Sequence, residues 1–439
     1  MENKYIILAD YCLETALKKG ADKARVTMER STEDLVATLN GEIDKVTRCS
    51  DSSISISLFV DGRYGSFSTN KLDESSLEDF IGKSVNMVRM LEIDGFRNLP
   101  DPSRTAKDAT GGDEMDLYDP EYENITSEYR RDMALKCTAF PSEGLVSEEG
   151  EYSDSLYETY VADTNGLKCR HRETSFDYGV EVTVDDGKGG KYSGYWWTAS
   201  PKICDFHPED CGKIALERAR ASIGAEPEKS GRYNMVIDSE AAAKVVSPIL
   251  KAINAFALQQ NNSFLMDSLG KQIFPEGMSI FDDAHLRGQS GSKLFDSEGV
   301  RTVSEPIIEK GIIRKYFVNT YMSGKTGLAP TVEAATRPHV LPWPKAGLDR
   351  DGIMKMCGRG ILVTDFNGGN SNSATGNFSY GIEGFLFENG RIVKPVSEML
   401  VTGNFITLWK GLIACGEDSR SCKSKLIPTL AFSNVDFSG

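Results

Sequence analysis

The sequence predicts an α+β protein with an N-terminal helix-on-antiparallel-sheet domain and a C-terminal domain rich in antiparallel β-strands. Two observations lead to this prediction. Amphipathic helical segments are few and stand apart from long runs of alternating polar and apolar residues. Asn-Gly and Asp-Gly pairs, which accept the positive φ angles of tight hairpins, separate several of those runs. We divide the chain into residues 1–200 and 201–439, within a boundary zone of about 190 to 230.

The first domain is expected to begin with a helix and a meander of strands. Apolar residues recur at helical spacing over residues 5–19, and Gly20 suits the end of a helix. Strand-like runs with turns at Asn40-Gly41 and Asp61-Gly62 follow, over residues 24–30, 35–39, 42–48, 54–60 and 63–69. A second amphipathic helix, over about residues 75–91, completes a helix-on-sheet unit.

The remainder of this domain contains one irregular segment. Residues 94–120 hold three prolines and a Gly-Gly pair without a helical or strand period, so we expect an exposed loop or an interdomain connection. A helix is predicted near residues 125–140, followed by long strands that turn at Asn165-Gly166 and Asp186-Gly187. Another helix is predicted over residues 207–224.

The second domain is expected to begin with a short buried strand at residues 233–237. A mainly helical segment follows over residues 240–260, in which Pro248 predicts a kink or a restart. From Ile280 onward short strands dominate, with turns at Lys310-Gly311, Gly368-Gly369 and Asn389-Gly390.

The composition excludes several classes of protein. The 439 residues carry 50 Lys+Arg against 65 Asp+Glu, a net charge of −15, and no Lys/Arg-rich block, which argues against direct nucleic-acid binding. No window approaches the roughly 18 uncharged apolar residues of a membrane span. The nine cysteines are scattered without a Cys-x-x-Cys pair, a pattern typical of reduced thiols and a cytoplasmic location.

The acidity is concentrated in one part of the chain. Residues 113–163 hold 15 Asp+Glu and 3 Lys+Arg, which gives 3 − 15 = −12 and leaves only −3 for the rest. We interpret this segment as a solvated face or a strip on which a partner docks.

A screen for catalytic motifs finds no established one. None of the four histidines has a partner three or four residues away, and neither a Gly-x-Ser-x-Gly elbow nor a Walker A loop is present. Asp282-Asp283-x-His285 could contribute to a metal site, although such turns are more often plain surface. Cys357 and Cys415 are conceivable nucleophiles, although buried inert cysteine is the commoner case.

Residues 359–404 form the most unusual stretch. A strand is followed by the loop Asn367–Gly376, rich in glycine and amide side chains, and then by a hairpin of β-branched and aromatic residues. The simple interpretation is a sheet with a long surface loop. The alternative is a sheet edge or cleft that hydrogen-bonds an extended peptide by strand addition.

At this stretch the chain resembles the TldD/PmbA family, once called modulators of DNA gyrase and regarded as peptidases. Six pieces, in order, carry the resemblance: residues 295–300, 308–312, 360–364, 375–381, 387–396 and Gly403-Asn404. The resemblance implies two kinds of subunit. The TldD kind carries a His-Glu-x-x-x-His zinc motif in the helix after a central strand, and the PmbA kind, also called TldE, lacks it and pairs with the first.

The equivalent segment here, residues 241–252, contains neither His nor Glu, so the chain resembles the PmbA kind. The resemblance therefore implies no metal and no catalytic residue in this chain, zinc in a TldD-like partner, and unfolded peptides as substrates, with hydrolysis dependent on that partner. Alone, the chain could form a homodimer.

Five residues are candidates for contact with the peptide, although structural hydrogen bonding is at least as good an interpretation for each. They are Arg337, His339, Asn377, Glu383 and Asn404. Two alternative functions stay open: a non-enzymatic regulatory or binding protein, as the name gyrase modulator suggests, and a metal-independent hydrolase that uses Cys357 or Cys415.

Overall fold

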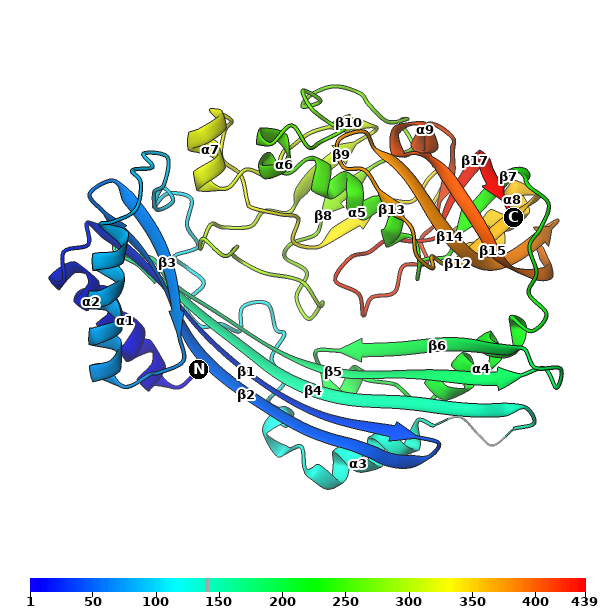
Figure 1. Ribbon diagram of the computed structural model, residues 1–439, viewed down its shortest axis with the longest axis horizontal. Coiled ribbons are helices and arrows are strands. Elements are labelled where there is room, and N and C mark those ends of the chain that lie inside the picture. Colours follow the sequence, from blue (N-terminus) through cyan, green and yellow to red (C-terminus); the bar gives the residue numbers. More distant parts are fainter. Residues whose placement is uncertain (139–141) are drawn as a thin grey trace.

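A long, curved, six-stranded sheet forms most of the N-terminal half of the chain, and the C-terminal half lies across one of its faces (Figure 1). The structure is a computed structural model that describes residues 1–138 and 142–439. The strand order is β3-β2-β1-β4-β5-β6, with every pair antiparallel. The strands are β1 (Lys23–Leu39), β2 (Glu42–Val60), β3 (Arg63–Thr69), β4 (Leu145–Asp163), β5 (Lys168–Asp185) and β6 (Lys191–Ser200).

The predicted meander is confirmed, but its strands are longer than expected. Residues 24–30 and 35–39 belong to one continuous strand, because the polar residues between them keep the alternation of the sheet. Thr32 and Asp34 point to the buried face and Ser31 and Glu33 to the open one. Asp34 forms an ion pair with Arg130 there (3.1 Å), which compensates the charge of an acidic residue on the buried face of the strand.

Four helices cover one face of this sheet. Helices α1 (Asn3–Lys18) and α2 (Glu74–Val88) pack over one end, where they bury side chains such as Met28 and Ile56. Helices α3 (Ser127–Lys136) and α4 (Cys211–Ala221) cover the other end. These helices were all predicted, with differing ends; the end predicted at residue 140 lies outside the described residues. The division at residues 1–200 and 201–439 stays a prediction.

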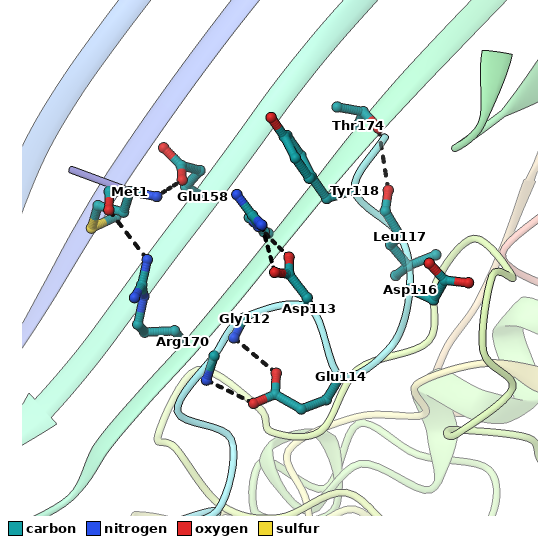
Figure 2. A network of polar contacts seen from close by, with 12 residues as sticks. Met1, Gly112, Asp113, Glu114, Asp116, Leu117, Tyr118, Glu158, Arg170 and Thr174 are labelled. Carbon is teal, nitrogen blue, oxygen red and sulfur yellow. Dashed lines mark hydrogen bonds and ion pairs between the residues drawn. The ribbon is translucent and has the colours of Figure 1, made fainter. Parts of the chain in front are cut away.

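The segment 94–120 is not the exposed loop that its composition suggested. Beyond the end of β6 it runs along β5: the amide of Arg170 donates to Ala109 O (2.6 Å), and that of Thr174 to Leu117 O (3.0 Å). Ala106, Ala109 and Leu117 are buried. Figure 2 shows this segment beside β5, with Gly112 bonded to Glu114 and with Arg170 reaching Met1. The segment therefore protects an edge strand that β6 leaves uncovered.

The acidic segment 113–163 is divided by the sheet instead of forming one solvated strip. Glu148, Asp154 and Glu158 are buried on the helix-covered side of β4, whereas Glu149 and Glu151 are exposed on the other side. Because successive side chains of a strand point to opposite faces, a run of carboxylates cannot all face solvent. The interpretation of the segment as a single strip was wrong for the buried residues.

The C-terminal half is built on a sheet whose pairings close into a ring. Strand β12 pairs with both β7 and β14, and the ring continues through β15 and β17 back to β7. Only the β12–β7 pair is parallel within the described residues. The members are β7 (Gly231–Ile237), β12 (Arg359–Asp365), β14 (Asn377–Glu388), β15 (Arg391–Asn404) and β17 (Leu430–Ser438), with β13 (Asn370–Ser371) and β16 (Leu412–Cys415) attached.

Short elements surround this ring. A four-stranded sheet has the order β10-β9-β8-β11. Its strands are β8 (Ile280–Asp282), β9 (Glu305–Glu309), β10 (Ile312–Ile313) and β11 (Pro338–Val340). The helices are α5 (Ala243–Ala252), α6 (Ala255–Gln259), α7 (Thr320–Thr326), α8 (Arg350–Cys357) and α9 (Phe405–Lys410). Two 3₁₀ turns, η1 (Pro120–Asn124) and η2 (Ile203–Asp205), pack instead with the core of the six-stranded sheet. Within residues 1–138 and 142–439, no helix has the length and apolar character to span a bilayer.

The predicted helical segment 240–260 is interrupted, but not at Pro248. Helix α5 continues through Pro248 and ends at Ala252. Asn254 then accepts a hydrogen bond from the amide of Phe256 (2.9 Å), which caps the start of α6. The restart is therefore set by a capping side chain six residues after the proline.

Candidate functional site

A groove of about 600 Å³ lies between helix α5 and the loop that carries β13. Helix α5 lines one wall with Ala243, Lys244, Ser247, Pro248 and Lys251, and residues 369–373 line the opposite wall. The lining is completed by Ala252, Ala257, Asn262, Phe264, Tyr380 and Phe405. The groove therefore includes residues of the loop that the sequence marked as unusual.

The orientation of α5 follows from its sequence. Val245, Val246, Ile249 and Ala252 are buried in the C-terminal core. Residues three and four positions apart share a helix face, so Lys244, Ser247 and Lys251 fall on the side away from that core. Lys244 and Ser247 are half-buried and Lys251 is exposed. Packing of the apolar face thus presents two ammonium groups and a hydroxyl to the groove.

The opposite wall is held by a network of short hydrogen bonds. The side-chain oxygen of Asn372 accepts from the amides of Ala374 and Thr375, both at 3.0 Å. The amide of Phe264 donates to Ser373 O (3.0 Å). Gly369 has a φ of 81°, and a Cβ there would collide with the backbone of Ser379. This loop is therefore an ordered surface despite its glycine- and amide-rich sequence.

Two predicted contact residues, Asn377 and Asn404, meet behind this loop. The Asn404 side chain donates to Thr375 O (2.8 Å) and to the side-chain oxygen of Asn377 (2.9 Å). The Asn404 oxygen also accepts from the amide of Ile406 (3.0 Å), which caps helix α9. These two residues thus support the groove wall, and their role in contacting a peptide stays a prediction.

Aromatic rings form the floor of the groove. Phe264 and Phe378 each stack on Phe405, with ring centroids 5.7 and 4.9 Å apart. Phe378 also stacks on Tyr380 at 5.3 Å, and the ammonium of Lys244 lies 4.7 Å from the centroid of the Tyr380 ring. The floor is therefore rigid and apolar, and a cation–π contact positions one of the two lysines at its edge.

The groove carries positive charge in an acidic protein. Lys244 and Lys251 are the charged residues of its lining, and among the described residues neither has a carboxylate close enough to form an ion pair. The remaining polar groups of the lining are side-chain amides and hydroxyls. Chemically, such a site can bind an anion and hydrogen-bond polar groups, but it has no nucleophile paired with a base.

The other three predicted contact residues lie elsewhere. Glu383 accepts a hydrogen bond from Asn367 (2.8 Å) and faces a separate cavity of about 620 Å³ between the six-stranded sheet and the ring of strands. Arg337 is buried, and its guanidinium donates to Ser290 O (2.9 Å). His339 pairs with Asp283 (2.8 Å). The structure therefore brings Asn377 and Asn404 together and separates the rest.

The candidate metal residues do not converge. Asp282 accepts from the amides of Thr336 and Arg337, Asp283 pairs with His339, and His285 contacts Thr302 (2.9 Å). Burial raises the pKa of Asp282 and lowers that of His285. Within residues 1–138 and 142–439, no group of three His, Cys, Asp or Glu residues is arranged to hold a metal ion.

The two candidate nucleophiles are poor ones in this fold. Cys357 and Cys415 are buried, and burial raises the pKa of their thiols to about 11 and about 12. Since the thiolate is the nucleophile, both thiols would be almost entirely protonated and unreactive at neutral pH.

Lys244, Ser247 and Lys251 were not among the contact residues predicted from the sequence. Their helix was interpreted from the absence of His and Glu, and not from the residues that it contains. The signal was available: polar residues at positions i, i+3 and i+7 on an otherwise apolar helix predict one shared, accessible face.

Comparisons with known proteins agree over nearly the whole chain. Three family models match, described as PmbA/TldA metallopeptidase domain 1 (residues 24–88), central domain (120–223) and C-terminal domain (230–439). Metalloprotease PmbA of Escherichia coli O157:H7 is 28% identical, over 96% of this chain and 95% of the relative.

Solved structures extend the likeness to the fold. A protein from Bacteroides thetaiotaomicron, described as a candidate modulator of DNA gyrase, superposes with a TM-score of 0.94 at 37% identity, over 99% of this chain and 98% of the other. TldE from Thermococcus kodakarensis superposes with a TM-score of 0.80 at 18% identity, over 98% and 100% of the two chains, which supports the fold alone.

Proposed function

The chain belongs to the PmbA/TldD metallopeptidase family, and from this premise we propose that it is the metal-free subunit of a cytoplasmic peptidase complex that degrades or processes unfolded peptides. In this proposal a related TldD-like subunit binds the metal, and the present chain helps to enclose and hold the substrate.

One observation carries the proposal. Helix α5 follows the central strand β7, at the position where the family resemblance implies a zinc-binding helix, and it faces a groove as an active-site helix would. The residues that it presents are Lys244, Ser247 and Lys251. Zinc sites in proteins use His, Cys, Asp or Glu, so this set of residues does not fit the metal.

The residues of this chain suit substrate holding. The ordered loop 369–373 and the aromatic floor form a rigid surface, and unfolded peptides supply free amides and carbonyls that side-chain amides and hydroxyls can bind. Pre-organised walls reduce the entropic cost of ordering a flexible peptide. In the partner, a bound zinc ion would activate water for attack on the peptide carbonyl.

The test is reconstitution. The chain is purified alone, with a TldD-like relative from the same organism, and with a variant of that relative in which both motif histidines are replaced by alanine. Cleavage of an unfolded protein substrate is measured with and without a chelator. We expect cleavage only with the unmodified relative and none after chelation. Chelator-insensitive cleavage by this chain alone would contradict the proposal.

A second candidate function, regulation of DNA gyrase, is favoured by the description of the Bacteroides relative. The net charge of −15 makes direct DNA binding unfavourable, so such a function would require contact with the gyrase protein itself. Gyrase supercoiling assays with the purified chain separate the two candidates, because a change in supercoiling without peptidase activity in any combination would favour regulation.

A further inference from the structure

We propose that the groove between α5 and β13 binds acidic peptide segments, with Lys244 and Lys251 holding their carboxylates. The inference rests on the proposed function, because it assigns a class of peptide to the groove of a substrate-holding subunit. It goes beyond that function in giving the groove a preference for negative charge.

The charge of the groove favours an anionic ligand. Two lysines line it without a carboxylate among the lining residues, in a chain whose net charge is −15. Some lysines of this chain are already engaged by carboxylates; the ammonium groups of Lys19, Lys83 and Lys168, for example, each lie within 2.7 Å of one. Ammonium groups without such partners are available to a ligand, and the ligand of complementary chemistry is an anion.

The spacing of the two lysines along α5 favours an extended ligand with more than one carboxylate. Seven residues along a helix correspond to a rise of about 10.5 Å. Carboxylates two residues apart in an extended peptide lie on one side and are separated by about 6.8 Å. The flexible stems of two lysines can close this difference. An extended segment with alternating acidic residues therefore matches the pair better than a compact anion, which would engage one lysine.

The opposite wall of the groove offers a strand edge to the backbone of a peptide. Strand β13 pairs with β14 at Asn370↔Ser379 and Ser371↔Phe378. No second strand pairs with β13 among the described residues. Asn370 and Ser371 are exposed and line the groove. An extended peptide could therefore place its backbone along β13 while its acidic side chains reach across to α5.

The net negative charge of the protein disfavours binding of an acidic peptide anywhere else on its surface. An acidic chain repels an acidic peptide at long range, so non-specific binding of a Glu-rich peptide is suppressed. A preference for the acidic peptide would therefore report the groove and not the overall charge.

The test uses the full-length chain alone and fluorescence anisotropy. The probes are three labelled twelve-residue peptides of alternating Gly/Ser and Glu, Gln or Lys. We expect the Glu peptide to bind more tightly than the Gln peptide and to weaken as salt is raised. The double variant Lys244→Gln/Lys251→Gln should bind the Glu peptide roughly tenfold more weakly, whereas Lys45→Gln, an exposed control on the six-stranded sheet, should not.

A charge-reversal variant keeps the test independent of folding defects. Lys251 is exposed, so Lys251→Glu should fold normally and shift the preference toward the Lys peptide. Equal binding of the Glu and Gln peptides by the unmodified chain would overturn the inference, as would a double variant that keeps the discrimination. Because no partner is present, these results are distinguishable from a failed reconstitution, which would contradict the proposed function instead.

Discussion

The two faces of the six-stranded sheet use the same residue type in opposite ways. On the face covered by helices, Asp154 is fully buried, and both of its oxygens accept from Arg130, at 2.7 and 2.8 Å. The opposite face is crossed in part by the C-terminal half and is otherwise open; on this open face, Glu149, Glu151, Asp177 and Glu181 line a cavity of about 590 Å³ without a Lys or Arg in its lining. The alternation of side chains along a strand separates them.

This difference shows that acidic residues concentrated in one part of the sequence can fall into two groups with different roles in the structure. Carboxylates under the helices are structural, because a buried charge must be paired and hydrogen-bonded to be tolerated. Glu149, Glu151 and Glu181 on the open face are exposed to solvent and add little to the free energy of unfolding, whereas Asp177 is half-buried. The following predictions test this division, from the largest expected effect to the smallest.

Breaking the buried ion pair should have the largest effect. Arg130→Met leaves Asp154 buried without its partner and also removes the contact to Asp34, so we expect a loss of about 3–5 kcal/mol in the free energy of unfolding. Urea denaturation measures it. The matched control is Arg131→Met, since Arg131 is next in sequence but half-exposed, at 52%. Equal losses for the two variants would show that the buried face is not held by this pair.

Two glycines test the packing of the same two faces. Gly194 of β6 lies under α4, and a Cβ there would overlap the backbone of Ala215 and Ala219. Since neither helix nor sheet can move freely, Gly194→Ala should cost about 1–3 kcal/mol. Gly179 faces the open cavity, and its Cβ would meet the movable side chain of Tyr195, whose hydroxyl oxygen would lie 2.6 Å away and whose nearest ring carbons 3.3 Å away.

For Gly179→Ala we therefore expect a change within about 0.5 kcal/mol. Thermal unfolding of both variants under one set of conditions makes the comparison. A larger loss for Gly179→Ala than for Gly194→Ala would mean that the open face is as tightly packed as the covered one.

Asp177 should give the smallest effect, and one of opposite sign. Burial raises the pKa of this open-face carboxyl. A carboxyl with a higher pKa in the folded chain favours folding while protonated, and that contribution is lost as the pH rises from the unfolded pKa through the folded one. Asp177→Asn should therefore raise the free energy of unfolding at neutral pH, by about 0.5 kcal/mol or less because the hydrogen bond from Ser175 (2.5 Å) weakens.

The gain should disappear in acid, where the carboxyl of the unmodified chain is protonated in both states. Urea denaturation at neutral pH and below the unfolded pKa of Asp measures the two values. A gain that persists unchanged at the lower pH would mean that the carboxylate charge is not its cause.

Much of the fold could be predicted from periodicity and turn chemistry. The turns at Asn40-Gly41, Asp61-Gly62 and Asn389-Gly390 are all present with positive φ angles. The helices that cover the six-stranded sheet follow from amphipathic spacing. The course of residues 94–120 could not be predicted, because their bonds are made to β5, a strand distant in sequence. Irregular segments obtain their hydrogen bonds from tertiary partners that composition does not identify.

The candidate site was predictable only in part. The amide-rich loop pointed to Asn377 and Asn404, which do meet at one wall of the groove. Arg337 and His339 are drawn to the Asp282–Ser290 region by the pairing of β11 with β8, a contact between segments more than fifty residues apart. Such long-range pairing has no local signal in a single sequence.

The position of β17 in the ring determines when the C-terminal half can complete its folding during synthesis. This strand, residues 430–438, pairs between β7 and β15, and its residues Leu430, Ala431 and Phe432 are fully buried. The ring cannot close on a ribosome until these residues emerge, roughly two hundred residues after β7 has left the exit tunnel. The six-stranded sheet is complete by residue 200 and can form much earlier. The half that carries the groove is therefore the half that depends longest on protection of its nascent apolar strands.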